Sequence, residues 1–259
     1  MTSFVDCPDS SRGEWRFRIF GIPVRVHPWF WLTILIMGAN QETGAAMIWI
    51  AVCFVSILLH ELGHVGAYHA FGERGSVVLY GFGGMAIPER DVDRSTQTQV
   101  LISLAGPAAG FCLAGLVGIA AVLAGAKVFF GFRMYVVPTV GAYLFSDHMS
   151  PSQLYHWNVL INDLLFVNFY WGLMNLLPVY PLDGGQAARA LFERAHPSRG
   201  RRRSLIVSAA VGAAVALFGA LERNMYLVFL FGILAASSVQ MLGAERRLFT
   251  PRPYREWRR

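Results

Sequence analysis

The chain has 259 residues, of which 55% are hydrophobic and only 15% are charged, and its mean hydropathy is +0.45. Soluble domains are about a quarter charged, so this composition excludes an ordinary soluble protein and indicates several membrane spans. The net charge of +6 would suit a nucleic-acid-binding protein. However, the basic residues lie in the segments between the apolar runs, so no nucleic-acid partner is expected.

Six apolar segments are predicted to cross the membrane, since a helix needs about 20 apolar residues to cross about 30 Å of hydrocarbon. The first segment is short and would span only by including its flanks or by thinning the bilayer. We therefore expect an all-α polytopic membrane protein, with a single domain over residues 1–259. The six spans cover about residues 26–41, 45–71, 97–125, 156–178, 204–221 and 225–243.

Two segments between the spans have the pattern of β-strands. Residues 16–27, RFRIFGIPVRVH, alternate around a Gly-Ile-Pro break. Residues 77–86, VVLYGFGGMA, are β-branched and aromatic and then glycine-rich, so we predict a hairpin over residues 75–87 at the cytoplasmic side of the second span. Residues 128–147 are half apolar, but their longest uncharged run is too short for a span. We interpret them as an extracytoplasmic loop.

The distribution of arginine predicts the orientation of the spans. With the N-terminus inside, 19 of the 22 basic residues fall in inside segments, and only Lys127, Arg133 and Arg223 fall outside. This is the positive-inside bias of membrane proteins. We therefore expect a multi-pass protein of the inner (cytoplasmic) membrane with both termini in the cytoplasm. The arginine-rich, lysine-poor composition suggests a bacterial source.

The second span contains the motif HELGH, residues 60–64. His60 and His64 share one face of a helix and can bind one ion, and Glu61 beside them can take a proton from a water molecule. Zinc suits imidazole ligands, and a catalytic zinc site has three protein ligands and an open position. Glu61 is the only formal charge in residues 43–72, and a charge at membrane depth costs at least about 2.5–3.5 kcal/mol, which favours a functional role. The alternative is a polar cluster that hydrogen-bonds neighbouring helices.

The third ligand has to come from another residue. His69 lies well off the face of His60 and His64, and Asp163 lies near the outer end of its helix, at a different level in the membrane. Asp183 fits better, because it closes NLLPVYPLDGG, where the prolines prevent regular helix. The chain can fold back there, and broken helix at membrane depth is tolerated where it lines a cavity. An ordinary Asp-Gly turn after the span is the alternative.

Two asparagines lie seven residues apart on the helix before this break. Asn168 and Asn175 could aim amide donors at a developing oxyanion. The alternative for both is a hydrogen bond between helices.

Four motifs in this order resemble the site-2 protease family of intramembrane zinc metalloproteases: HELGH, GFGG (81–84), SLAGP (103–107) and NLLPVYPLDGG (175–185). The resemblance covers about residues 19 to 190. The chain resembles a small member of the family that has no PDZ or CBS domain. The resemblance implies that His60, His64 and Asp183 bind one zinc ion per chain. It also implies that Glu61 is the general base and that Asn175 stabilises the oxyanion or holds substrate.

The same resemblance implies that the hairpin binds substrate as an extended strand. Residues 81–84 would do so by β-augmentation, since a helical substrate has to unwind before attack. The substrate-binding residues are then Gly81, Phe82, Gly83, Gly84 and Asn168. The strand elements would lie at the cytoplasmic side of the active site.

The expected function is that of an intramembrane zinc endopeptidase, which cleaves a transmembrane segment of a membrane-protein substrate near the cytoplasmic leaflet. Its partners are this substrate and the lipid bilayer. Two other classes are kept as alternatives. A membrane metal transporter would need polar groups at several depths, and a catalytically inactive scaffold would not need the intact HELGH and LDG motifs.

Overall fold

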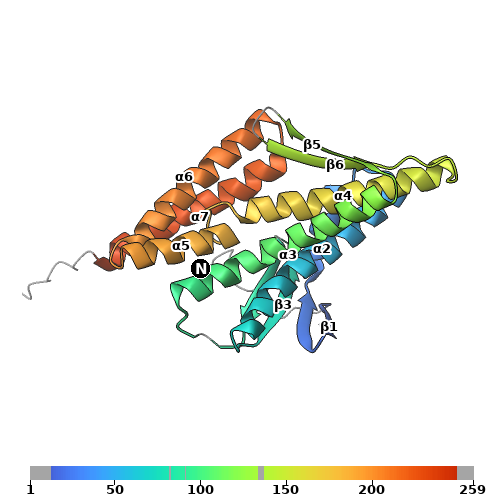
Figure 1. Cartoon of the computed structure of the whole chain (residues 1–259). Coiled ribbons are helices and arrows are strands. Elements are labelled where there is room, and N and C mark those ends of the chain that lie inside the picture. The colour runs from blue at the N-terminus through green and yellow to red at the C-terminus, as the bar shows by residue number, and fades with distance from the viewer. Residues whose placement is uncertain (1–12, 82, 91, 134–136, 250–259) are drawn as a thin grey trace, which may run out of the picture. The chain divides into compact units, whose positions relative to one another are not determined.

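The computed structural model of the chain describes residues 13–81, 83–90, 92–133 and 137–249 (Figure 1). The described part is mostly helical and has two small β-sheets. It forms two compact units, Met1–Asn175 and Leu176–Arg259.

The first unit is built on three long helices that pack pairwise, α2 (Thr43–Ala70), α3 (Thr96–Leu123) and α4 (Pro151–Asn175). A short helix, α1 (Pro28–Gly38), precedes them. It begins at a proline, whose fixed φ suits a first helical position, and the His27 Nδ1 accepts a hydrogen bond of 3.2 Å from the Trp29 amide. The helix α3 begins at Ser95, whose hydroxyl accepts from the Thr98 amide at 3.1 Å, a typical N-cap.

Four strands form a sheet beside α2, in the order β1 (Trp15–Ile19), β2 (Ile22–Val26), β3 (Gly75–Tyr80) and β4 (Gly83–Pro88). The pairs β1–β2 and β3–β4 are antiparallel hairpins, and β2 and β3 pair in parallel. Alternate residues of the two central strands face the core and are at most 1% exposed: Val24, Val26, Val77 and Leu79. Both strand predictions are therefore confirmed.

Residues 128–147 are more regular than the predicted loop, and their extracytoplasmic side stays a prediction. They belong mostly to a second, two-stranded sheet, β5 (Lys127–Arg133) and β6 (Val137–Tyr143). Side chains of α4 form hydrogen bonds with backbone groups of β6 and of the residue that follows it. The Asn162 side chain of α4 accepts from the Ala142 amide at 3.1 Å and donates to the Ala142 carbonyl at 2.7 Å. Asn158 makes the same pair of bonds with Leu144 at 2.7 and 3.1 Å. Two side-chain amides thus replace a neighbouring strand, and no local pattern signals that.

Four helices of the described chain are long and apolar enough to cross a membrane, α2, α3, α6 (Gly200–Leu221) and α7 (Met225–Phe249). The prediction of a multi-pass membrane protein is confirmed, and four of the six predicted spans are supported. The helix α1 has 11 residues and is therefore only about 17 Å long at 1.5 Å per residue. The helix α4 has 25 residues, but its first half carries polar side chains: Gln153, His156, Asn158, Asn162 and Asp163.

The second unit contains α6 and α7 packed as a hairpin, preceded by α5 (Asp183–Ala195). The two long helices approach closely at Gly212, where an added Cβ would lie 3.2 Å from the Ala235 Cβ. The helix α5 was not predicted, because it is short and carries four charged side chains. Asp183, one of the predicted zinc ligands, is the first residue of this helix.

The close packing of α2 on α3 gives a first testable prediction. A Cβ at Gly63 would lie 2.7 Å from the Ala105 carbonyl oxygen and 2.9 Å from the Ala109 Cβ, whereas a Cβ at Gly66 would meet open space. Gly63→Ala should therefore push the two helices apart and cost about 1–3 kcal/mol. Thermal unfolding of the metal-free protein in detergent should occur several degrees lower for Gly63→Ala, while Gly66→Ala should unfold at or slightly above the wild-type temperature. Equal shifts in the two variants would contradict the packing described here.

Candidate metal centre

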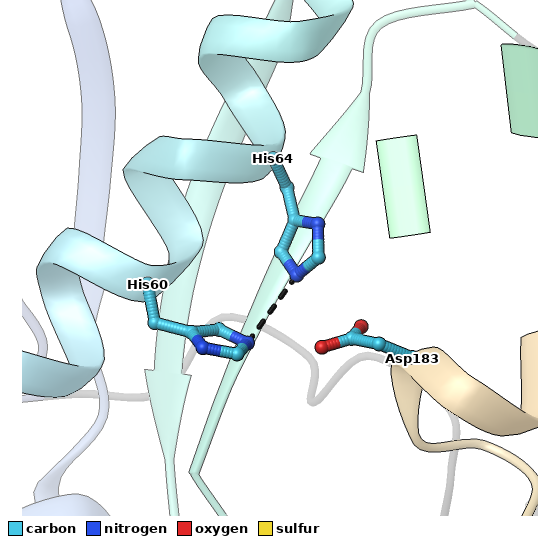
Figure 2. Close-up of side chains that lie close together, drawn as sticks. All are labelled: His60, His64 and Asp183. Atoms are coloured by element: carbon cyan, nitrogen blue, oxygen red, sulfur yellow. Dashed lines mark hydrogen bonds between the residues drawn. The ribbon is translucent and has the colours of Figure 1, made fainter. Parts of the chain in front are cut away.

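Two buried histidines face each other on α2. His60 is 3% exposed and His64 is 6% exposed, and they lie four residues apart on one face of the helix. Their Nε2 atoms are 3.3 Å apart, and the two rings stand at 76° to each other (Figure 2). The predicted pairing of these two side chains is thus present in the folded chain.

A backbone contact fixes the protonation of one ring. The His64 Nδ1 lies 2.7 Å from the carbonyl oxygen of Ile102, in α3. A carbonyl oxygen can only accept, so Nδ1 carries the proton and the lone pair is on Nε2. Histidines that ligate metals are held in this way, with the other ring nitrogen donating to a carbonyl or a carboxylate. The Nε2 of His64 therefore carries the lone pair that a metal ligand needs.

The spacing of the two nitrogens fits one tetrahedral metal ion. Two nitrogens that each lie about 2.0–2.1 Å from a tetrahedral ion are about 3.3 Å from each other. The Nε2 atoms of His60 and His64 are separated by that distance. The pair is therefore arranged for metal binding without movement of α2.

A glycine on α3 leaves room in front of the two rings. A Cβ at Gly106 would lie 2.7 Å from the His60 Nε2 and closer still to the His64 Nε2. Real Cβ atoms do not make such contacts, so any larger residue here would displace the imidazoles. Gly106 belongs to the SLAGP motif, whose small residues let α3 approach the two histidines of α2.

The carboxylate of Glu61 lies against the edge strand β4. Glu61 is 5% exposed, and a Cβ at Gly84 would lie 2.5 Å from its Oε1 atom and 2.7 Å from its Cδ. The absence of a side chain at Gly84 therefore makes space for the carboxylate.

The other glycines of the hairpin pack against α4 and α1. Gly83 has φ +130°, a conformation that side-chain-bearing residues rarely adopt, and an added Cβ would lie 2.7 Å from the Trp171 ring of α4. Gly81 packs against α1, where an added Cβ would lie 3.2 Å from the Thr33 hydroxyl. Phe82, the remaining predicted substrate-binding residue, lies outside the described residues.

The end of α2 is tied to the elements that follow it. The Arg94 Nε donates to both carboxylate oxygens of Glu73, at 2.9 and 3.2 Å, and its guanidinium lies 5.3 Å from the centre of the Tyr68 ring. The Tyr68 hydroxyl in turn donates to the Ala86 carbonyl of β4 at 3.5 Å. The hydrogen bond from Arg94 holds the pKa of Glu73 below its ordinary value. These contacts of Tyr68, Glu73 and Arg94 fix β4 and the start of α3 to the helix that carries the histidines.

Asp183 lies in the second unit. It is the first residue of α5 (Figure 2). Asp183 is 8% exposed and follows a turn that contains the cis peptide bond Tyr180–Pro181. A carboxylate at a helix N-terminus is favoured by the helix dipole. The prediction that Pro178 and Pro181 prevent regular helix agrees with the end of α4 at Asn175, although the predicted span reached residue 178.

A sequence model of peptidase family M50 matches residues 48–219, which is more than half of the chain. The chain belongs to peptidase family M50. It is similar to a zinc metalloprotease of Methanocaldococcus jannaschii, with 27% identity over 82% of this chain and 55% of the relative. It is also similar to the stage IV sporulation protein FB of Bacillus subtilis, with 24% identity over 81% of this chain and 63% of the relative. The chain thus spans about half the length of the curated relatives that it matches.

The fold of this M50 chain is also that of a solved structure. The site-2 protease from Methanocaldococcus jannaschii superposes with a TM-score of 0.57 at 22% sequence identity, over 88% of this chain and 95% of that chain. The likeness shows the fold, and it agrees with the family resemblance that the motifs carry.

The side-chain amides of Asn168 and Asn175 donate hydrogen bonds to groups on helices. The Asn168 amide donates to the Ser56 hydroxyl of α2 at 2.8 Å and to the Leu164 carbonyl at 2.8 Å. The Asn175 amide donates to the Trp171 carbonyl of its own helix at 2.9 Å. The bond to Ser56 is the interhelical alternative given above for Asn168. The roles of both residues toward substrate stay predictions.

Two residues that orient or make room for His60 and His64 were not predicted from the sequence. The Ile102 carbonyl orients His64 from a position 38 residues away, and no side-chain pattern announces a carbonyl. Gly106 could have been found, because the run SLAGPAAG has small residues along a helix, which is typical of close helix packing. The two discarded ligand candidates lie elsewhere: His69 is exposed, and Asp163 has one buried carboxylate oxygen without a hydrogen-bond partner.

Proposed function

We propose that the chain is an intramembrane zinc endopeptidase, and that it cleaves a transmembrane segment of a membrane-protein substrate. The observation that carries this proposal is the buried HELGH pair, with two Nε2 atoms 3.3 Å apart in a helix apolar enough to cross a membrane. Family membership and the zinc metalloprotease among the relatives support the same chemistry.

His60, His64 and Asp183 are the proposed ligands of one zinc ion, and Figure 2 draws these three side chains. The donor set suits zinc, which binds imidazole nitrogen and carboxylate oxygen in catalytic sites. When bound, zinc supplies a Lewis acid that polarises the scissile carbonyl and increases the acidity of a water molecule. The Ile102 carbonyl keeps His64 in the tautomer that this role needs.

The remaining chemistry belongs to the side chains of the protein. Glu61 takes the proton of the attacking water and gives it to the leaving amine. Asn175 donates to the oxyanion. The substrate unwinds and pairs with β4 at the hairpin of Gly81, Phe82, Gly83 and Gly84, and Asn168 assists in holding it. Because Gly84 borders Glu61, this pairing brings a substrate backbone to the general base.

The proposed topology has six spans in one domain, with α1 and α4 added to the four helices that are long and apolar enough. Both termini are cytoplasmic, the membrane is the inner membrane of a bacterium, and β1 to β4 lie at the cytoplasmic side of the active site. The arginine distribution supports this orientation. The lipid bilayer and the substrate are the partners.

Removal of the third ligand tests the proposal. Asp183→Ala should bind zinc at least about a hundredfold more weakly than the wild type, because loss of an outer partner of a metal ligand alone costs about 10–100-fold. Zinc content of the purified protein and competition with a chelator measure this. Asp93→Ala, an exposed carboxylate, is the matched control and should keep one zinc per chain.

The same variants test cleavage in cells. A membrane protein that is shortened when the wild type is expressed, and intact with Asp183→Ala, is the expected substrate. A wild-type protein that binds no zinc, or an Asp183→Ala protein that binds it as tightly, would show that the ligand set is wrong.

A further inference from the structure

The turn before Asp183 is attached to α6 by its backbone. The amide of Tyr180 donates to the hydroxyl oxygen of Ser208 at 2.8 Å. A buried backbone amide outside a helix or a sheet needs an acceptor, and here a side chain of α6 supplies it. Ser208 is 1% exposed, so water does not compete for this bond.

The bond continues through a second serine to α7. The hydroxyl oxygens of Ser208 and Ser238 are 2.7 Å apart, and the Ser238 hydroxyl donates to the Leu234 carbonyl at 3.0 Å. Each serine has one proton to give. Since Ser238 gives its proton to Leu234, the Ser208 hydroxyl donates to Ser238 and accepts from Tyr180. The four groups form one directed chain of hydrogen bonds in which every donor is used.

The turn is packed against the start of α5 as well. The Leu182 amide donates to the Val179 carbonyl at 2.8 Å, and the Gln186 side chain donates to the Pro181 carbonyl at 3.1 Å. A Cβ at Gly185 would lie 2.5 Å from the Tyr180 nitrogen. Because the turn and the first residues of α5 contact one another this closely, a shift of the Tyr180 backbone would be passed on to Asp183.

We propose that Ser208 and Ser238 are positioning residues, and that they hold the Asp183 carboxylate in place for metal binding by anchoring the Tyr180 amide to α6 and α7. This inference rests on the proposed function, in which Asp183 is a zinc ligand. The simpler role is to join α6 to α7, as serines often do between membrane helices. That role needs the Ser208–Ser238 bond and does not involve the Tyr180 amide.

Removing the Ser208 hydroxyl separates these roles. In the metal-free protein, Ser208→Ala should speed hydrogen–deuterium exchange in the peptide that contains Tyr180. In zinc titrations against a chelator it should weaken binding by less than about 10–100-fold, the usual cost of losing a direct partner of a metal ligand, because Ser208 acts on Asp183 only through the Tyr180 turn. Ser238→Ala keeps the direct bond between Ser208 and Tyr180. It should change the exchange rate and the zinc affinity in the same direction as Ser208→Ala, but by less. Ser237→Ala is the matched control, since Ser237 is the half-buried neighbour of Ser238 and lies outside this chain of bonds.

The outcomes distinguish this inference from the function on which it rests. Faster exchange together with weaker zinc binding in Ser208→Ala, but not in Ser237→Ala, supports the positioning role. Unchanged exchange or unchanged zinc affinity in both Ser208→Ala and Ser238→Ala overturns it. If Asp183→Ala loses zinc and Ser208→Ala does not, only the positioning role fails. If Asp183→Ala keeps its zinc affinity, the ligand assignment itself fails.

Discussion

Replacing Glu61 by glutamine is expected to remove cleavage and to leave metal binding intact. Glutamine has the shape of glutamate, so the close contact with Gly84 is kept and the fold should not change. It cannot take the proton of the attacking water, and general acid–base catalysis contributes about 10²–10⁴-fold. Cells that express Glu61→Gln should therefore accumulate the uncut membrane protein that the wild type shortens, while the purified variant keeps one zinc per chain.

The exposed Glu89 provides the matched control. Glu89→Gln should cleave and bind zinc as the wild type does. The same variant also distinguishes the alternatives. A metal transporter needs no general base, so zinc flux into vesicles that Glu61→Gln leaves undiminished would favour transport. A scaffold would give the same membrane proteome with the wild type and with Glu61→Gln.

The parts of this site that sequence could predict are local. His60 and His64 lie one helical turn apart, and a helix brings any such pair to one face. The end of α4 before Pro178 follows from the missing amide of proline. The hairpin of β3 and β4 follows from its glycines and β-branched residues, which are close in sequence. In each case the residues that decide the structure lie close together in the sequence.

The parts that sequence could not predict depend on distant partners. The hairpin of β5 and β6 is held on one edge by Asn158 and Asn162, whose side chains pair with Leu144 and Ala142. The asparagines by themselves are typical polar residues of a helix, and only the fold shows that they substitute for a strand. The bonds of Ser208 are of the same kind, because Tyr180 and Ser238 lie 28 and 30 residues away.

Alanine at position 106 is expected to disable the histidine pair without disturbing the helix that carries it. The new methyl group would lie 2.7 Å from the His60 Nε2 and nearer to the His64 Nε2, in the space that a bound ion would need if these two nitrogens are ligands. His64 cannot turn away freely, because its Nδ1 is bound to the Ile102 carbonyl at 2.7 Å. Loss of an outer hydrogen-bond partner of a metal ligand lowers metal affinity by about 10–100-fold. The zinc affinity of Gly106→Ala should fall by at least as much, and cleavage should fall with it.

Gly115 on the same helix provides the matched control, because a Cβ there would meet open space. Gly115→Ala introduces the same helix preference, worth up to about 1 kcal/mol, and no collision. It should bind zinc and cleave as the wild type does. The decisive comparison is zinc titration of the two variants beside their metal-free unfolding temperatures. If Gly106→Ala bound zinc as tightly as Gly115→Ala, the ion could not lie in front of the two Nε2 atoms, and the close approach of α3 would serve packing alone.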